Sequence, residues 1–234
     1  MENTAYFTPV ASLSDERRAL FIKKTYANVA IAVLTFALLE TFLLQSETIV
    51  RALLGMMGSN LSWFLLLGGF MFVTNYSQKM AMKATDRTTQ YVALGIFVLA
   101  EAIIFVPLLT LAMIFMEESG TNVLAQAGIV TIGLFVGLSA IALFSKKDFS
   151  FLSKALTIGF FIALGLMIAG AIFGFNLGLW FSAGMVVLSA GSILYQTSNI
   201  VHEYHEEQYV AASLGLFASL MLLFWYILSI FMRD

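Results

Sequence analysis

The most ligand-like cluster in the sequence consists of His202 and His205 with three neighbouring glutamates, Glu203, Glu206 and Glu207. A His-x-x-His pair on one helical turn can bind a divalent metal, because imidazole nitrogens are common metal ligands. The zinc-protease arrangement instead places the histidines at i and i+4 with a glutamate between them. We therefore interpret the cluster as a solvated acidic loop at a membrane surface and expect no metal there. A weak pH sensor is the alternative, since histidine titrates near pH ~6.5.

Glu101 is the second candidate, because it lies near the middle of a long apolar segment. Insertion scales assign an acidic residue at the centre of a spanning helix a cost of about 2.5 to 3.5 kcal/mol. Two interpretations remain open: a functional carboxylate inside the membrane, or a neutral carboxylic acid that hydrogen-bonds to a neighbouring helix. Glu40 is closer to the end of its segment, and we expect its side chain to reach toward water.

The residues needed for several known catalytic arrangements are missing. The chain has no cysteine, which excludes thiol nucleophiles, disulfides and thiolate metal sites. The Gly-Leu-Ser-Ala sequence at 137–140 faintly resembles a serine-protease motif, but both histidines fall in a loop and provide no intramembrane base. The apolar segment at 208–232 has no lysine for a retinal Schiff base, and no Gly-x-x-x-x-Gly-Lys phosphate loop occurs. We expect a protein that is not an enzyme and holds no cofactor.

The composition indicates which elements position these residues. Of the 234 residues, 60% are hydrophobic and only 11% are charged, and the mean hydropathy is +0.92. Soluble domains contain roughly 25% charged residues, so this chain cannot cover a water-facing surface and must be solvated by the lipid bilayer. Seven spanning helices would use roughly 140 residues, which leaves little for a separate globular domain. The net charge of −2 argues against binding of nucleic acid.

Charged residues divide the chain into a polar cytoplasmic tail at 1–24 and a single membrane domain at 25–234. The tail is not a signal peptide, because its apolar run starts too late and lasts too long. The window at 155–201 contains no charge and is too long for one span, so we expect a turn at the Gly- and Asn-containing stretch 174–178. The sequence thus predicts an all-α bundle with seven transmembrane helices, at about 25–44, 61–78, 90–114, 124–144, 155–175, 178–200 and 209–232.

The basic residues predict the orientation of the bundle. Cations accumulate in cytoplasmic loops, and only Arg51 and Arg233 fall on the opposite side from the other ten. We therefore expect a cytoplasmic N-terminus and a C-terminus outside. The loop at 201–208 contains no Lys or Arg, although this topology makes it cytoplasmic. The ten cations on the cytoplasmic side are Arg17, Arg18, Lys23, Lys24, Lys79, Lys83, Arg87, Lys146, Lys147 and Lys154.

Two Gly-x-x-x-Gly pairs occur, Gly133 with Gly137 and Gly170 with Gly174. This spacing lets the backbones of spanning helices approach closely, so the pairs indicate packing and not activity. The second pair adjoins the expected turn at 174–178, and turn formation explains it equally well.

The stretch at 145–152, Ser-Lys-Lys-Asp-Phe-Ser-Phe-Leu, resembles the Thr/Ser-Lys-Lys-Asp-aromatic/Leu-Ser-x-Leu loop of the Bax inhibitor-1 (transmembrane Bax inhibitor motif) family. Its motif residues here are Lys146, Lys147 and Asp148. Glu101 stands six residues before Pro107, as in that family's Glu-Gly-Leu-Ser-Leu-x-Pro pattern, with alanine replacing the glycine. The resemblance covers nearly the whole chain and implies a seven-span layout.

The calcium-leak members of this family are described as gated by two aspartates, in spans six and seven. This chain has Gln196 and Phe217 at those positions, and two neutral side chains cannot share a proton. The sequences at 197–202 and 233–234 instead resemble the bacterial branch, whose named member modulates the membrane-anchored AAA protease FtsH. The resemblance implies a stress-related inner-membrane protein that binds and modulates FtsH. A calcium or proton leak that uses Glu101 is the alternative.

Overall fold

The computed structural model describes residues 9–84, 86–145 and 147–233. Within these ranges the chain forms eight α-helices and two short 3-10 helices, and the only β-type pairing is an isolated bridge between Pro9 and His205. The elements are η1 (Val10–Ser12), α1 (Asp15–Gln45), α2 (Glu47–Met57), α3 (Asn60–Lys83), α4 (Arg87–Ser119), α5 (Val123–Phe144), α6 (Leu152–Phe173), α7 (Gly178–His202), η2 (Glu206–Gln208) and α8 (Tyr209–Phe231).

The helices confirm an all-α membrane fold. By length and composition, six helices are able to cross a bilayer, and the number becomes seven if α2 and α3 are counted as one bent span. Each of the seven spans expected from the sequence coincides with a helix, α1 or one of α3 to α8. The orientation of the bundle in the membrane remains a prediction.

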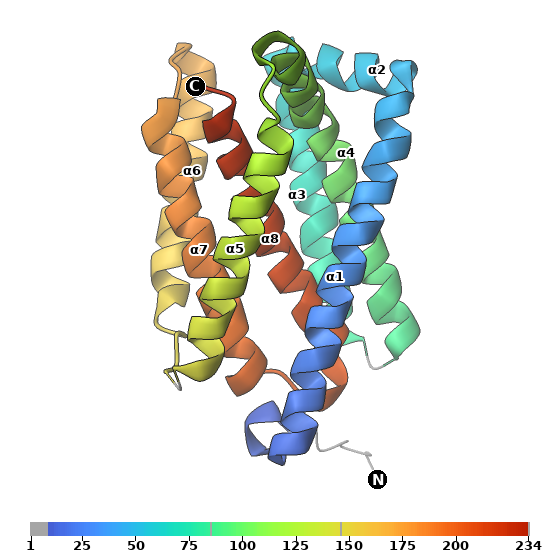
Figure 1. The fold of residues 1–234 in the computed structure, drawn as a ribbon, viewed down its shortest axis with the longest axis vertical. Coiled ribbons are helices and arrows are strands. Elements are labelled where there is room, and N and C mark those ends of the chain that lie inside the picture. Colours follow the sequence, from blue (N-terminus) through green and yellow to red (C-terminus); the bar gives the residue numbers. More distant parts are fainter. Residues whose placement is uncertain (1–8, 85, 146, 234) are drawn as a thin grey trace.

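The helix α2 was not expected, and it lies across one end of the bundle (Figure 1). The chain turns by 109° between α2 and α3. Leu53 is buried, whereas Glu47 and Arg51 form an exposed ion pair one turn apart. This amphipathic pattern suits a helix that lies at the surface of a bilayer.

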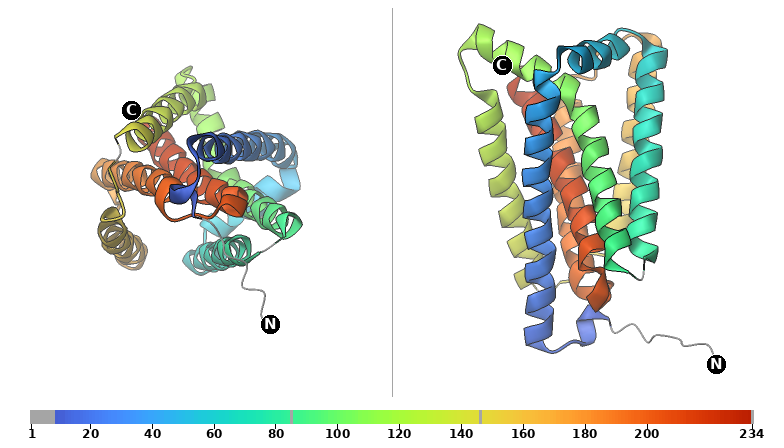
Figure 2. Two further views of the ribbon diagram at one scale, coloured as in Figure 1. Left: turned by 90° about the horizontal axis from the view of Figure 1, so that it is seen from below. Right: turned by 90° about the vertical axis from the view of Figure 1, so that its right-hand side faces the viewer.

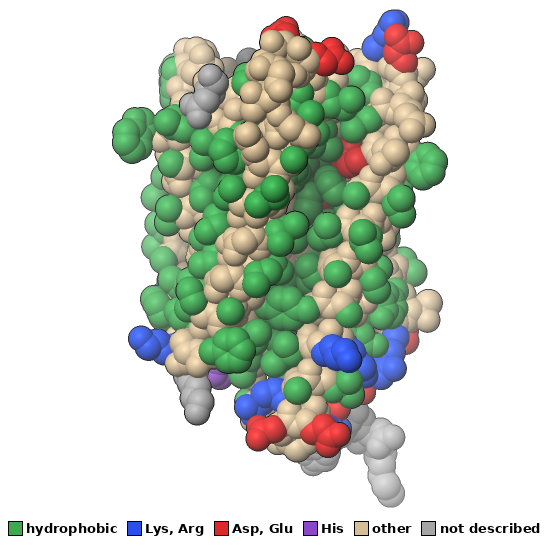
Figure 3. Space-filling view, viewed as in Figure 1, with side chains coloured by type: hydrophobic (Ala, Val, Ile, Leu, Met, Phe, Trp, Pro, Cys, Tyr) green, Lys and Arg blue, Asp and Glu red, His purple; other side chains and the backbone are tan. Residues whose placement is uncertain are grey.

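The helix α8 runs through the middle of the bundle, as the end-on view in Figure 2 shows. It packs against α1, α4, α5 and α7, and most of its residues are buried. The helix α6 lies at the periphery and packs chiefly on α7. Its outer face carries exposed large apolar side chains such as Ile158 and Phe161. Green side chains are spread over the middle of the face seen in Figure 3, and the charged side chains gather mainly near its two ends, as expected for a surface solvated by lipid.

The turn between α6 and α7 confirms the break predicted at 174–178. Gly174 and Gly178 have φ angles of 72° and 69°, a left-handed conformation that glycine adopts without steric cost. A Cβ on Gly170 would lie 3.1 Å from the carbonyl oxygen of Phe175, so the Gly170–Gly174 pair serves this turn. By contrast, a Cβ on either Gly133 or Gly137 would meet no atom within 4 Å, and this pair packs against no helix within the described chain.

Candidate functional site

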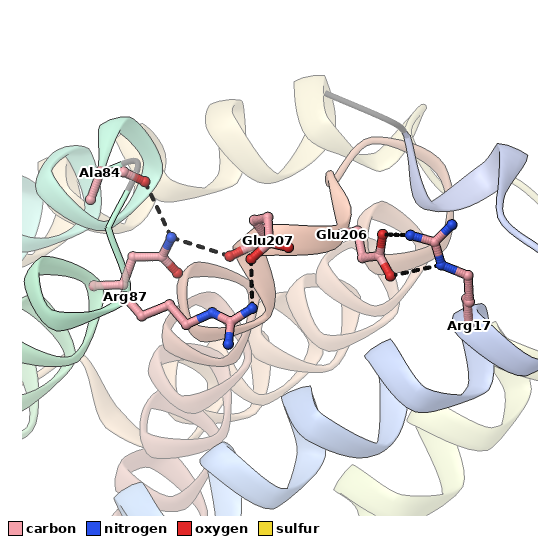
Figure 4. A network of polar contacts seen from close by, with 6 residues as sticks. Arg17, Ala84, Arg87, Glu206 and Glu207 are labelled. Carbon is pink, nitrogen blue, oxygen red and sulfur yellow. Dashed lines mark hydrogen bonds and ion pairs between the residues drawn. The ribbon is translucent and has the colours of Figure 1, made fainter. Parts of the chain in front are cut away.

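The loop between α7 and α8 (residues 203–208) is held by charges that come from two other helices. The Nε of Arg17 in α1 donates to Oε1 of Glu206 at 3.0 Å, and Nη2 of Arg87 in α4 donates to Oε2 of Glu207 at 2.8 Å (Figure 4). This pairing explains why the loop needs no Lys or Arg of its own. Both ion pairs are largely exposed, so each is individually weak and mainly positions the loop.

Amide side chains fasten the same loop to the connection between α3 and α4. The Nε2 of Gln90 donates to the carbonyl oxygens of Ala84 and Glu207, at 3.2 Å in each case. The Nε2 of Gln208 donates to the carbonyl oxygen of Met82, also at 3.2 Å. The beginning of α4 and the beginning of α8 are therefore held in a fixed relation.

The segment just before α1 docks on this loop. The N–H of Val10 donates to the carbonyl oxygen of Tyr204 at 2.8 Å, beside the bridge between Pro9 and His205. Val10 is 0% exposed and Leu13 is buried as well. The part of the expected tail at 1–8 lies outside the described residues, but residues 9–13 are attached to the loop. We call residues 9–17 and 203–208 together the docked end.

Tyr209, the first residue of α8, adds an aromatic contact to the docked end. Nζ of Lys24 lies 5.3 Å from the centre of its ring, and the guanidinium carbon of Arg87 lies 5.7 Å from it. A cation close to the face of a tyrosine ring is attracted by the negative charge of the ring face. Helices α1 and α4 thus meet the start of α8 through both ion pairs and ring contacts.

The family loop motif fastens the α5–α6 connection to α7. Oδ1 of Asp148 accepts from the N–H of Ser150 at 2.8 Å and from the hydroxyl of Ser198 at 3.3 Å. The same hydroxyl oxygen accepts from the N–H of Phe149 at 2.9 Å. The Ser150 amide holds the pKa of Asp148 below its usual range, and nearby His202 and Ser198 act in the same direction. Asp148 therefore acts as a clamp for the loop.

The two lysines of the motif make less specific contacts. The N–H of Lys147 donates to the hydroxyl oxygen of Ser145 at 3.4 Å, whereas Lys146 lies outside the described residues. The side chain of Lys147 is exposed at the end of the bundle where cations were predicted to accumulate. Solvent exposure accounts for a charge at this position without an ion-pair partner.

The two histidines make separate contacts. Nδ1 of His202 lies 2.9 Å from the carbonyl oxygen of Ser198, at the end of α7. His205 lies in the bridge to Pro9, and its backbone N–H donates to Oε1 of Gln208 at 3.1 Å. Among the described residues, no group of three or more His, Asp or Glu side chains is placed to hold a metal ion. Both histidines thus have structural contacts of their own.

Glu101 lies in the interior, on a stripe of α4 that it shares with two phenylalanines. Phe97, Glu101 and Phe105 are four residues apart and buried, and Glu101 is 6% exposed. The ring of Phe105 lies 5.1 Å from that of Phe36 in α1, and the ring of Phe97 lies 6.2 Å from that of Phe217 in α8. Aromatic rings from three helices therefore lie about one helical turn before and after Glu101. This aromatic cluster consists of Phe36, Phe97, Phe105, Phe217, Phe224 and Trp225.

The two family gating positions occupy different surroundings. Gln196 lies against Gly215 of α8, where a Cβ would be 2.8 Å from its Oε1. Phe217 is completely buried in the aromatic cluster. Because residues two apart on a helix do not share a face, Gln196 packs on one side of α8 while Phe217 points to another.

Glu40 differs from its sequence interpretation. It lies on the buried stripe of α1 four residues after Phe36, is 4% exposed, and neither of its carboxylate oxygens has a hydrogen-bond partner among the described residues. The expectation that it reaches water was wrong, because the distance from the end of a helix does not decide which face a residue occupies. Its spacing from Phe36 was the signal that indicated burial.

Comparisons with known proteins agree with this architecture. The model of the family described as inhibitor of apoptosis-promoting Bax1 matches residues 18–234. A protein of Escherichia coli K12 named modulator of FtsH protease YccA is 29% identical over 231 residues, which are 94% of this chain and 95% of that protein. Bax inhibitor 1 of Schizosaccharomyces pombe is 28% identical over 228 residues, 95% of this chain and 80% of the relative.

A third relative is matched over a shorter stretch. An uncharacterised protein of Pseudomonas aeruginosa is 42% identical over 114 residues, which cover 48% of this chain and about half of the relative, 51%. The family match, in contrast, extends from Arg18, near the start of α1, to the end of the sequence. The chain is therefore a multi-pass membrane protein that belongs to the Bax inhibitor-1 family.

Proposed function

We propose that this protein resides in a bacterial inner membrane, binds a membrane-anchored AAA protease of the FtsH type, and modulates its activity without catalysing a reaction itself. The observation that carries the proposal is the similarity to the E. coli modulator of FtsH protease, which extends over 94% of this chain and 95% of that relative. A likeness over this length extends over most of the membrane-spanning part of the chain.

We place the contact with the protease at the docked end. This end joins four segments through exposed ion pairs and single hydrogen bonds. Such contacts are individually weak, so a partner can replace them at small cost. On the predicted topology the docked end is cytoplasmic, where an AAA protease carries its ATPase.

The aromatic cluster supports a modulator over a leak pathway. Fully buried Phe217 occupies one gating position and neutral Gln196 the other, so no pair of acids remains at these sites. An ion path requires polar groups or water along its length, whereas the level of Glu101 is surrounded by phenylalanine rings.

A calcium or proton leak remains the second candidate, because Glu40 and Glu101 are both buried inside the bundle. Acidic residues at membrane depth are costly and commonly mark ion or proton pathways. Phe36 stands four residues before Glu40 in α1, and Phe105 stands four residues after Glu101 in α4. The contact between these two rings therefore lies between the two acids. For a leak, this ring pair would have to move.

The test is photo-crosslinking combined with co-purification of the full chain and FtsH. A crosslinker at Glu203, in the docked end, is expected to capture the protease in the membrane. The same crosslinker at Glu47, on α2 at the opposite end, is the matched control and is expected to capture none. Capture from Glu47 alone would contradict the placement at the docked end. Absence of FtsH from both the crosslinks and the co-purified material would contradict the partnership.

A further inference from the structure

A groove of about 420 Å³ opens between the last turns of α4 and α8, at the end of the bundle opposite to the docked end (Figure 1). One wall comes from α4 and consists of Leu111, Ile114, Phe115 and Glu118. The other wall comes from α8 and the residues after it, and consists of Ser229, Met232 and Arg233. Neither the proposed contact with a protease nor the aromatic cluster uses these residues.

The groove is apolar along its length and charged at its mouth. The α4 residues follow the i, i+3, i+4, i+7 pattern that places them on one helix face. Leu111 and Ile114 are 43% and 45% exposed, so the apolar wall is open to the surroundings of the bundle. Glu118 lies at the end of this face, in the last turn of α4. An amphiphile with a charged head and a long apolar chain matches this pattern.

The two charges at the mouth are available for a ligand. Neither Glu118 nor Arg233 takes part in an ion pair within the part of the chain that the structure describes. The hydroxyl of Ser229 donates to the carbonyl oxygen of Trp225 at 2.8 Å, and its oxygen can still accept a hydrogen bond. The mouth therefore presents an unpaired acid on one wall and an unpaired base on the other.

The helix ends beside the groove favour a cation near Glu118 and an anion near Arg233. The C-terminal end of α4, beside Glu118, exposes carbonyl oxygens and carries a partial negative charge that favours a cation. Nη1 of Arg233 lies 3.9 Å from where a Cβ on Gly178 would be, so the guanidinium is close to the start of α7. A helix start carries a partial positive charge, and together with the neighbouring cation it favours an anion that contacts both.

We propose that this groove binds a zwitterionic phospholipid whose head group carries a primary amine. Its phosphate would lie against Arg233 and the start of α7, and its ammonium against Glu118 and the end of α4. One acyl chain would follow Leu111 and Ile114. An ammonium group has three N–H donors, which suit the Glu118 carboxylate together with nearby helix carbonyls, whereas a quaternary ammonium has none.

A second groove in the same molecule provides an internal comparison. It has a similar volume, about 410 Å³, and lies between α3 and α4 beneath Met56 of α2. Its walls contain only apolar side chains and Gly69. With no charged group at its mouth, this groove is expected to accept acyl chains without a preference for the head group.

The proposal is tested by native mass spectrometry of the full-length protein with dioleoyl phosphatidylethanolamine, phosphatidylcholine or phosphatidylglycerol added to the detergent. We expect the unmodified protein to retain one phosphatidylethanolamine about fivefold more strongly than phosphatidylcholine, the net effect of roughly one ordinary hydrogen bond. Glu118→Gln is expected to abolish this preference, and Arg233→Gln to weaken retention of all three phospholipids. Ile114→Trp, which fills the groove, is expected to remove the tightly retained lipid.

Two variants at the same end of the bundle serve as matched controls. Glu117→Gln removes a neighbouring acid that does not line the groove, and Arg51→Gln removes a cation on α2. Both are expected to retain phosphatidylethanolamine as the unmodified protein does. Equal retention of phosphatidylethanolamine and phosphatidylcholine by the unmodified protein would overturn the proposal. So would a loss of preference in the control variants as large as that in Glu118→Gln. Stronger retention of phosphatidylglycerol than of phosphatidylethanolamine would also overturn it and would indicate a site for anionic lipid.

Discussion

Acidic residues at the docked end and in the interior of the bundle differ in their exposure and in whether they have a partner. At the docked end, Glu206 and Glu207 are partly exposed, and each pairs with an arginine from another helix. In the interior, Glu40 is buried and neither of its oxygens has a partner in the described chain. Exposed pairs are weak and easily exchanged, whereas an unpaired buried polar group lowers stability. The first region is therefore suited to contact with a partner, whereas the buried acid in the second region lowers the stability of the bundle.

The largest effect is expected from Phe217→Ala, which removes a completely buried ring from the aromatic cluster. Truncation of a buried phenylalanine typically lowers the free energy of unfolding by about 3–5 kcal/mol. Thermal unfolding in detergent measures the loss. Phe173→Ala is the matched control, because Phe173 is exposed at the end of α6, and it should change stability by less than about 0.5 kcal/mol. Equal losses in the two variants would mean that the cluster does not organise the interior.

Glu40→Leu is expected to raise stability, because it replaces a buried carboxyl group that has no partner. Leaving a buried polar group unsatisfied costs about 1–3 kcal/mol, and leucine removes that cost at similar volume. The measurement is again thermal unfolding, with Glu47→Gln at the exposed start of α2 as the control. A clear loss of stability in Glu40→Leu would show that the carboxyl group has a favourable role in the folded bundle.

Ser198→Ala is expected to loosen the α5–α6 loop, because the N–H of Phe149 loses its acceptor. The hydrogen bond that the same hydroxyl donates to Asp148 is lost as well. A net hydrogen bond is worth about 0.5–1.5 kcal/mol, and hydrogen exchange at residues 149–152 measures the loss. Since the pKa of Asp148 is lowered in the folded protein, its contribution is present above the ordinary value of about 3.9 and is lost as the pH falls through the lowered pKa. In Asp148→Ala this pH dependence should disappear, and its persistence would mean that another group is responsible.

The smallest effect on stability is expected for the exposed pair of Arg17 and Glu206. A double-mutant cycle with Arg17→Gln and Glu206→Gln should give a coupling below about 1 kcal/mol that decreases with added salt. Hydrogen exchange at Val10 should nevertheless increase, because the pair helps to dock its segment. A coupling well above that range would mean that the docked end is a rigid part of the fold and not an exchangeable contact.

Much of the fold was predictable from the spacing of charges and glycines. The apolar helices α1 and α3 to α8 and the turn at 174–178 follow from them, because lipid excludes charge and glycine allows the left-handed turn. The short helix α2 was missed, since Arg51 was used only as a boundary between apolar windows. Its 11 residues, Glu47–Met57, are too few to stand out as a span.

The site was less predictable, because its contacts join distant parts of the chain. Arg17 and Glu206 are 189 residues apart in sequence, and no pattern within either segment indicates the other. The docking of Val10 depends on a backbone hydrogen bond, which residue type does not reveal. For Asp148 the motif was recognised as a family feature, but its role as a clamp required the position of Ser198.

The most direct test of the proposed function is reconstitution of this protein with FtsH in one population of liposomes, with calcium flux recorded in parallel. The rate of ATP-dependent degradation of a membrane substrate is expected to change in proportion to the amount of this protein. Calcium flux is expected to stay at the level of liposomes without it, at neutral and at acidic pH. A degradation rate independent of the protein, together with an acid-sensitive calcium leak that Glu101→Gln abolishes, would contradict the proposal and establish the leak pathway instead.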